Sequence, residues 1–420
     1  MESAVEVTCR GQVARRARGA VFAVFAVNGF LAAMWVAHIP AVTDRTGVSH
    51  ATLGLLILVM AGSGIIGMQA AGPLADRFGS RMLVAAAVTW LSLAVLGPAF
   101  ATGPVQLAVA LALFGCANGA LDVSMNAQAV QVEQVYGRPI MAAFHGLFSC
   151  GGLAGSLAGA AAMHANVDIR AGFAIAALLG LVVMAASVPN LLPRLPAVSR
   201  VEAPPDPAAA DQAAALVPAA PIAHRIRMWL PRNVLALAAI AFALLMAEGV
   251  ANDWSALQTH EHLGVADATA ALSFGAFSTA MTIGRFGADR VSGRFGRVAL
   301  VRWGSVLGAA GLAVVMISPW LPLSLAGWIL AGLGLAGGVP QIFTAAGNLG
   351  TSTAATDMSK VFGLGYLGFL AGPSVIGWLA QLTSLTVAFT FPFLAVLLCA
   401  WFAPTVGAGE PILDLQDKNS

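Results

Sequence analysis

The sequence has little charge: Asp, Glu, Lys and Arg make up 10% of its 420 residues, whereas hydrophobic residues make up 59%. Because soluble domains usually have about 25% charged residues, this composition excludes an ordinary soluble globular protein. The alternation of apolar and polar residues that a membrane β-barrel requires is also lacking. The composition therefore predicts an all-helical membrane protein.

Motifs of catalysis are lacking as well. The four cysteines have neither the spacing of a disulfide framework nor that of a metal site; they are Cys9, Cys116, Cys150 and Cys399. There is no GxxxxGK[ST] sequence, so ATP is not the energy source. No nucleophile with a neighbouring base is evident either. We therefore expect no enzyme activity, no metal, no cofactor and no nucleic-acid partner.

Long charge-free windows define the predicted membrane spans, since a spanning helix needs about 20 mostly apolar residues. Six windows suit one span each, namely 19–43, 46–75, 139–167, 171–193, 233–247 and 268–284. Three more are long enough for two spans each, namely 82–121, 303–356 and 361–409. These three split at turn residues: Gly103-Pro104, Ser318-Pro319 with Pro322, and Leu382 to Ser384. The windows thus predict twelve transmembrane helices.

The positions of Lys and Arg predict the orientation. With the N-terminus in the cytoplasm, 19 of the 21 basic residues fall inside, and only Arg45 and Arg170 fall outside. Arg285, which follows the eighth predicted span, counts among the inside residues. This bias is the positive-inside signal, and it places both termini in the cytoplasm. The first apolar segment has no convincing cleavage site, so we interpret it as an uncleaved span.

A segment rich in Pro and Ala divides the predicted spans into six and six, and it is typical of a flexible linker. The predicted organisation is a cytoplasmic N-terminal segment, a six-helix bundle, the linker, a second six-helix bundle and a cytoplasmic tail. Their residues are 1–18, 19–191, 192–231, 232–405 and 406–420.

Both predicted bundles carry an Asp-Arg pair in a short inside loop after their second span. The first copy is GPLADRFGSR, from Gly72 to Arg81, and the second is GRFGADRVSGRFGR. The first copy resembles the signature loop of the major facilitator superfamily. The matching residues that we predict to form a cytoplasmic gate, with their counterparts in the second copy, are Gly72, Asp76, Arg77, Gly79, Arg81, Asp289 and Arg290. The resemblance implies two pseudo-symmetric six-helix bundles, the major facilitator fold.

Two interpretations of the loop charges stay open. They are ordinary inside anchors, or they form a clasp that favours the outward-open state, as the resemblance implies. In the second case Asp76 binds a helix N-terminus, while Arg77 and Arg81 pair with carboxylates or helix C-termini. We favour the clasp because a charge pair shifts an equilibrium when its contacts differ between states.

Ionisable residues inside membrane helices are costly, so Asp122 in the fourth span and Glu248 in the seventh are predicted functional residues. Asn118, Asp122 and Asn126 are spaced four residues apart and form one polar stripe. The remaining cavity candidates lie in the first, seventh and tenth spans; they are Asn28, Trp35, His38, Asn252, Gln341 and Asn348. The resemblance implies that spans one, four, seven and ten line the central cavity.

GALDVSMNAQ, around Asp122, together with RPIMAAFHGLFSCGGLAG, is similar to a bacterial branch near the fucose permeases. That resemblance implies a polar solute such as a sugar, taken up with protons, and a coupling role for Asp122. His145 is interpreted as an interfacial packing residue, with a proton relay as the alternative. The glycines from Gly151 to Gly159 are interpreted as close helix packing.

The sequence therefore predicts a secondary active transporter in the plasma membrane, the inner membrane of a bacterium. Its partners are protons, a small-molecule substrate and the lipid bilayer, and its mechanism is alternating access by proton symport. Proton antiport that exports a drug or metabolite is the nearest alternative. A membrane sensor or scaffold without transport is a further alternative of a different class.

Overall fold

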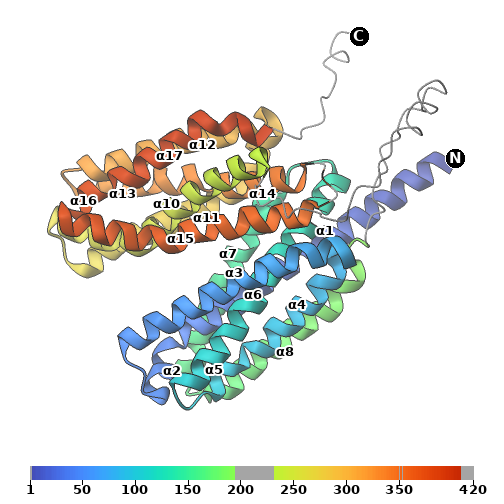
Figure 1. The fold of residues 1–420 in the computed structure, drawn as a ribbon, viewed down its shortest axis with the longest axis horizontal. Coiled ribbons are helices and arrows are strands. Elements are labelled where there is room, and N and C mark those ends of the chain that lie inside the picture. Colours follow the sequence, from blue (N-terminus) through green and yellow to red (C-terminus); the bar gives the residue numbers. More distant parts are fainter. Residues whose placement is uncertain (1, 194–230, 350, 352, 408–420) are drawn as a thin grey trace, which may run out of the picture.

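The chain folds into two bundles of long helices that lie side by side (Figure 1). The structure is a computed structural model, and it describes residues 2–193, 231–349, 351 and 353–407. Most of the predicted linker and of the C-terminal tail lies outside these residues. The N-terminal segment is part of the first helix, which begins at Glu2.

The first bundle contains eight α-helices and one short 3₁₀ helix in the described residues. They are α1 (Glu2–Ala37), α2 (Ile39–Thr46), α3 (His50–Phe78), α4 (Ser80–Ala94), α5 (Leu96–Phe100), α6 (Pro104–Tyr136), α7 (Met141–His164), α8 (Ile169–Ser187) and η1 (Val188–Asn190). The break before α6 falls at the predicted turn, where Gly103 is extended and Pro104 occupies the first helical turn.

The second bundle contains eight α-helices and a 3₁₀ helix in the described residues. They are α10 (Arg232–Leu263), α11 (Asp267–Phe295), α12 (Arg297–Ile317), α13 (Leu321–Leu335), α14 (Gly338–Gly347), α15 (Ala354–Leu382), α16 (Leu385–Ala388), α17 (Thr390–Phe402) and η2 (Ala403–Gly407). α13 and α14 together form the tenth predicted span, interrupted next to Gly337.

The predicted all-helical membrane fold is confirmed. Eleven segments within the described residues are long and apolar enough to span a membrane. α11 lies between two of these segments and makes the twelfth by position, although it is more polar than the others. Its charged residues are Asp267, Arg285, Asp289, Arg290 and Arg294.

The two Asp-Arg pairs lie within helices, which corrects their predicted position in loops. α3 continues to Phe78 and α4 begins at Ser80, so the connection is Gly79 alone. Gly296 connects α11 to α12 in the same way. Gly79 has φ 87° and Gly296 has φ 83°, a region that glycine enters without steric cost. Asp289 lies four residues further from Gly296 than Asp76 lies from Gly79. Four residues are about one helical turn, so the two aspartates lie on the same side of their helices relative to the glycine.

The glycines from Gly151 to Gly159 pack α7 against α1, as the sequence predicts. A methyl group at Gly151 would overlap the backbone carbonyl of Ala26, and one at Gly155 would overlap that of Phe30. Helices that approach this closely gain van der Waals contact where lipid supplies no hydrophobic driving force.

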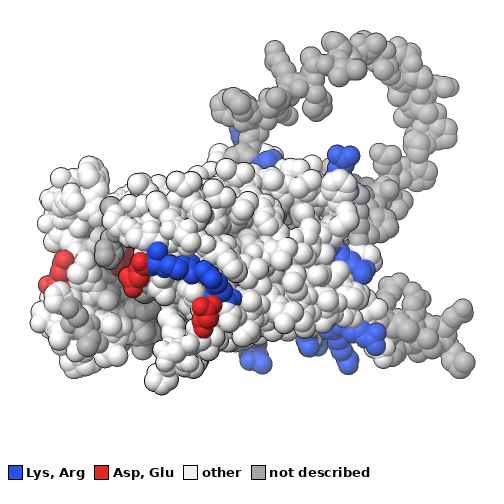
Figure 2. Space-filling view, turned by 90° about the horizontal axis from the view of Figure 1, so that it is seen from below, with Lys and Arg blue, Asp and Glu red and all other residues white. Residues whose placement is uncertain are grey.

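The two bundles make contact mainly at one end. Figure 1 shows their ribbons closest near the N-terminus of the chain and further apart near α2 and α16. Among the described residues, the hydrogen bonds between the halves lie between this end and the middle of the helices. In Figure 2, several Lys and Arg side chains lie towards the same end, while most of the face shown is uncharged. We assign this end to the cytoplasm.

Candidate functional site

Asp122, in the middle of the polar stripe of α6, meets the second half of the molecule. Asp122 is 7% exposed and Asn126 is fully buried. The Asn126 amide donates to Asp122 Oδ1 at 3.2 Å and to the Asp122 backbone carbonyl at 2.9 Å. Asp122 Oδ2 has no hydrogen bond of good geometry among the described residues. Tyr366 of α15 is the residue of the other half whose hydroxyl interacts with this carboxyl group.

His145 of α7 continues the stripe. Its Nε2 lies 3.2 Å from Asn126 Oδ1, and because an amide oxygen only accepts, His145 donates this bond. The ring packs edge-on against Phe25 and tilted against Phe343, at 5.4 Å and 5.9 Å between centroids. Our favoured interpretation of His145 as an interfacial packing residue is therefore incomplete. The sequence does not show that α6 and α7 bring His145 opposite Asn126.

Arg285 joins the two halves next to His145. It donates to Glu248 of α10 at 3.1 Å and to the Ser149 hydroxyl of α7 at 2.7 Å. Ser149 in turn donates to the backbone carbonyl of His145 at 3.3 Å. The side chains of Arg285 and Glu248 are 13% and 14% exposed. The assignment of Arg285 to the inside loop residues is thus wrong, since an ion pair holds it within the bundle.

These residues form one cluster between the halves, which we call the central polar cluster: Asp122, Asn126, His145, Ser149, Glu248, Arg285 and Tyr366. It contains one carboxylate paired with a guanidinium and one carboxylate, Asp122, with no basic partner among the described residues. Burial of an unpaired carboxylate is costly, so protonation is the ordinary way to keep it there.

A second set of carboxylates holds the cytoplasmic ends together. Asp76 of α3 accepts from the backbone N–H groups of Ala355 and Thr356 at 3.0 Å and 2.9 Å, at the start of α15. The Thr356 hydroxyl adds a third bond at 2.6 Å. Gly72 allows this approach, because a methyl group there would press on the Ala355 carbonyl at 2.8 Å. An acidic residue of the first half therefore caps a helix of the second.

The reverse contact exists at the start of α7. Asp289 of α11 accepts from the backbone N–H groups of Ala142 and Ala143 at 2.9 Å and 2.7 Å. Glu133 of α6 accepts from those of Ile140 and Met141, at 2.8 Å and 2.9 Å. Each half thus caps a helix of the other through the Asp of its Asp-Arg pair.

Comparison with known proteins agrees with this architecture. The family model described as Major Facilitator Superfamily matches residues 20–258. An uncharacterized MFS-type transporter of Yersinia pestis is 33% identical over 384 residues, which cover 91% of this chain and 94% of that protein. The chain belongs to the major facilitator superfamily. It is therefore a multi-pass membrane transporter rather than an enzyme, and its bacterial relatives indicate the inner membrane.

Two solved superfamily structures show the same fold. FucP, described as the fucose:proton symporter of E. coli, matches in its outward conformation with a TM-score of 0.75 and 14% identity. The match covers 92% of this chain and 98% of that chain. The proton:xylose symporter XylE matches with a TM-score of 0.71 and 13% identity, over 94% and 95% of the two chains.

Several of the residues predicted to line the cavity lie outside the central polar cluster. His38 is buried near the outer end of α1, where it bonds to the Met34 carbonyl at 2.8 Å and packs on Phe173. Trp35 is also buried, among the core residues. These two residues pack the helices, and in the described part of the chain no hydrogen bond joins them to the cluster.

The candidates of the tenth span lie towards the cytoplasmic end. Gln341 accepts from Ser292 at 3.0 Å, and Asn348 accepts from Gln134 of the first half. Asn252 of α10 is half-buried, one turn beyond Glu248.

Asn28 and Asn118 remain near the stripe of α6. Asn28 is buried and donates to the Met125 sulfur at 3.7 Å, and Asn118 lies one turn before Asp122. The side-chain oxygens of both amides are buried without a hydrogen-bond partner among the described residues. They extend the set of unsatisfied acceptors that begins with Asp122 Oδ2.

The arginines of the gate motif differ in their surroundings. Arg77 is exposed and lies over the Phe78 ring, at 5.0 Å from its centroid. Arg81 is half-buried at the start of α4, and Arg290 is exposed on α11. The hydrogen bonds between the halves described above at these two positions are made by Asp76 and Asp289.

Sequence reasoning missed Ser149 and Tyr366. Serine is common in this chain, so its position gives no signal. Tyr366 does give one, because the sequence contains only two tyrosines, and this one lies in the middle of a predicted span.

Proposed function

We propose that this transporter takes up a small polar solute together with protons, and that Asp122 carries the coupling proton. The observation that supports this is the contrast between the two buried carboxylates. Glu248 is neutralised by Arg285, whereas Asp122 has an amide and a phenol as neighbours. A group without a fixed countercharge changes its protonation more readily than an ion-paired one.

The central polar cluster can couple protonation to the conformation, because it contains groups from both halves. Asp122 and His145 belong to the first half, while Tyr366 and Arg285 belong to the second. Charging or neutralising Asp122 changes its interaction with groups that move relative to it when the halves rock. A proton therefore biases the equilibrium by its differential affinity for the two states. In this proposal, residues 19–191 and 232–405 are the two rocking bundles.

The solute is expected to bind between the cluster and the outer side. Asn28 Oδ1, Asn118 Oδ1 and Asp122 Oδ2 are buried without a hydrogen bond of good geometry among the described residues. A bound solute that carries hydroxyl groups would supply donors to them. Asn252 is a further candidate on the opposing helix. The names of the two solved neighbours, which are proton symporters of fucose and xylose, support a sugar or similar polyol.

The carboxylates at the cytoplasmic ends are proposed to form the gate. Asp76 and Asp289 each bind a helix start of the opposite half, so both contacts must break when the cytoplasmic side opens. They stabilise the state in which this side is closed. Arg77, Arg81 and Arg290 are proposed to support the gate through charge at the membrane surface.

Substrate identification is the first experiment. The purified protein is incubated with a panel of sugars, polyols and amino acids, and ligands are recognised by the rise in its unfolding temperature. Accumulation of each ligand is then measured in cells with and without an uncoupler.

We expect accumulation that the uncoupler abolishes. Asp122→Asn should bind the ligand and exchange it across the membrane without accumulating it. If cells export the ligand in a way that depends on the proton gradient, the protein is an antiporter and not a symporter. Ligand binding without flux would favour a sensor. Full accumulation by Asp122→Asn would remove Asp122 from the coupling role.

A further inference from the structure

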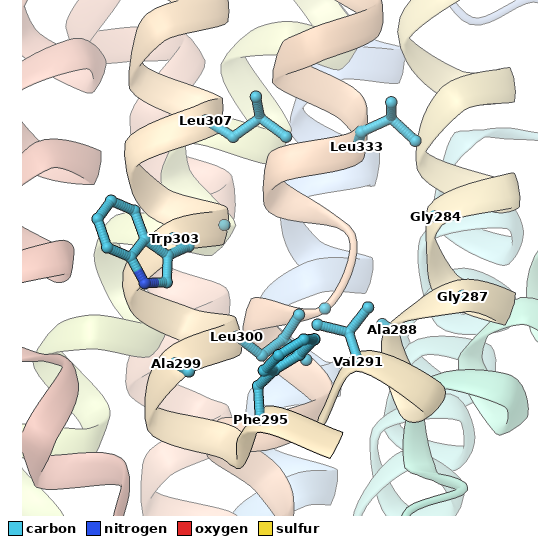
Figure 3. A pocket seen from close by; sticks show the side chains of 12 residues that line it. Gly284, Gly287, Ala288, Val291, Phe295, Ala299, Leu300, Trp303, Leu307 and Leu333 are labelled. Carbon is cyan, nitrogen blue, oxygen red and sulfur yellow. The ribbon is translucent and has the colours of Figure 1, made fainter. Parts of the chain in front are cut away.

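The second half has a groove on its lipid-facing surface, apart from the central polar cluster. It lies between α11, α12 and α13, has a volume of about 570 Å³, and is lined by apolar side chains and glycines (Figure 3). Phe295 lies at one end of it, and Leu307 and Leu333 lie at the other. Phe295 and Trp303 are 62% and 66% exposed, so the groove faces the surroundings of the bundle.

The groove exists because glycines line its floor, and no side chain there fills the space between the helices. Gly287 lines it from α11, and a methyl group at this position would meet no atom within 4 Å. Gly337 lines it at the interruption between α13 and α14. The space is therefore an opening in a surface that membrane lipid covers.

Two arginines follow the groove-lining face of α11 towards the cytoplasm. Arg290 and Arg294 are three and seven residues after Gly287, which places them on the same helix face as Gly287 and Val291. Both arginines are exposed, and the described residues provide neither with a carboxylate partner. Arg294 lies over the Phe295 ring, at 5.3 Å from its centroid.

α12 repeats this arrangement on the other wall. Arg302 is exposed, three residues after Ala299 and one before Trp303, both of which line the groove. Its long side chain can extend to the membrane surface while its stem stays in the apolar layer. The groove runs along α12 from Ala299 to Leu307, which is about 12 Å at 1.5 Å per residue. Half of a hydrocarbon core is about 15 Å, so the groove matches one leaflet.

We propose that this groove binds an anionic phospholipid of the inner leaflet. An acyl chain lies between α11 and α12, and the phosphate headgroup pairs with Arg290, Arg294 and Arg302. The apolar lining excludes a polar solute, and three arginines without carboxylate partners favour an anionic headgroup over a zwitterionic one. The opposite side of α11 carries Arg285 and Asp289, so the lipid packs against the helix that contacts both the cluster and α7.

The experiment compares two lipids with identical acyl chains, phosphatidylglycerol and phosphatidylcholine, added to the purified full-length protein in detergent. We expect phosphatidylglycerol to raise the unfolding temperature by more than phosphatidylcholine does. A phosphatidylglycerol with a photoreactive group in its chain should label peptides of α11 and α12. Labelling that is confined to other helices would overturn the proposal.

Gly287→Leu adds a side chain at a groove position where the Cβ meets no atom within 4 Å, and Gly275→Leu is its matched control. Gly275 is exposed on the same helix, and a methyl group there also meets nothing within 4 Å. Gly287→Leu should lose the lipid-dependent shift and the labelling, whereas Gly275→Leu should keep both. Replacing the three arginines by Gln should make the two lipids equivalent. Equal responses of the two glycine variants, or a wild-type protein that does not distinguish the lipids, would refute the assignment.

Discussion

Glu133 and Asp289 come from different halves of the chain, yet their carboxylates bind four consecutive backbone N–H groups, those of residues 140–143, at the start of α7. The first N–H groups of a helix have no partner within the helix, so the two side chains together satisfy this end. Only the Asp289 contact crosses between the halves. It is therefore the one that must change when the halves move.

Replacing Asp289 by Ala should open the cytoplasmic side. The lost hydrogen bonds involve a charged acceptor, and such bonds contribute about 1.5–3 kcal/mol, which corresponds to roughly tenfold to 100-fold in the equilibrium between states. Spin labels on the cytoplasmic ends of the two halves measure this shift as a longer distance between them.

Glu133→Ala is the matched control, because it removes the same kind of cap within one half. It should lower the unfolding temperature and leave the distance between the labels unchanged. If the two variants lengthen that distance equally, the contact between Asp289 and α7 does not act as a gate.

The Arg285–Glu248 ion pair should tolerate loss of both charges better than loss of one. Glu248→Gln leaves the Arg285 guanidinium buried without its carboxylate, at a cost of up to about 3 kcal/mol. The double variant with Arg285→Gln removes that unpaired charge. The unfolding temperatures of the two single variants and the double variant form a double-mutant cycle. We expect the double variant to lose less stability than the sum of the two single losses. Additive losses would show that the pair contributes no net stability.

Gly151 and Gly152 are adjacent in sequence, but we expect an added methyl group to destabilise the protein only at Gly151. A methyl group at Gly151 overlaps the Ala26 carbonyl, whereas one at Gly152 lies 3.8 Å from the nearest atom, the Gly29 carbonyl oxygen. Gly151→Ala should therefore destabilise the protein by about 1–3 kcal/mol, the usual cost of overpacking. Gly152→Ala should be neutral or slightly stabilising, because Ala favours helix. The unfolding temperatures of both variants test this, and equal values would mean that α1 and α7 separate easily.

The fold could be predicted from the sequence because the membrane requires long apolar helices, and turn residues such as Gly103 and Pro104 mark their ends. The stripe from Asn118 to Asn126 could be found because residues four apart lie on one face of a helix. Both signals are local along the chain, so a single sequence contains them.

The rest of the site depends on contacts between distant segments. The positive-inside rule assigns Arg285 to the cytoplasmic surface, because the rule does not distinguish a loop arginine from one that a carboxylate holds inside the bundle. Tyr366 meets Asp122 only after the two halves pack together. The position of Asp76 and Asp289 within helices follows from the conformation of Gly79 and Gly296, which composition does not reveal.

The most direct test of the account measures protons during transport. A transported solute is added to proteoliposomes that contain the protein and have no pH gradient, and the external pH is followed. Wild-type protein should make the medium more alkaline as solute enters, whereas Asp122→Asn should move solute down its gradient with no pH change. If Asp122→Asn removes as many protons per solute as the wild type, Asp122 does not carry the coupling proton.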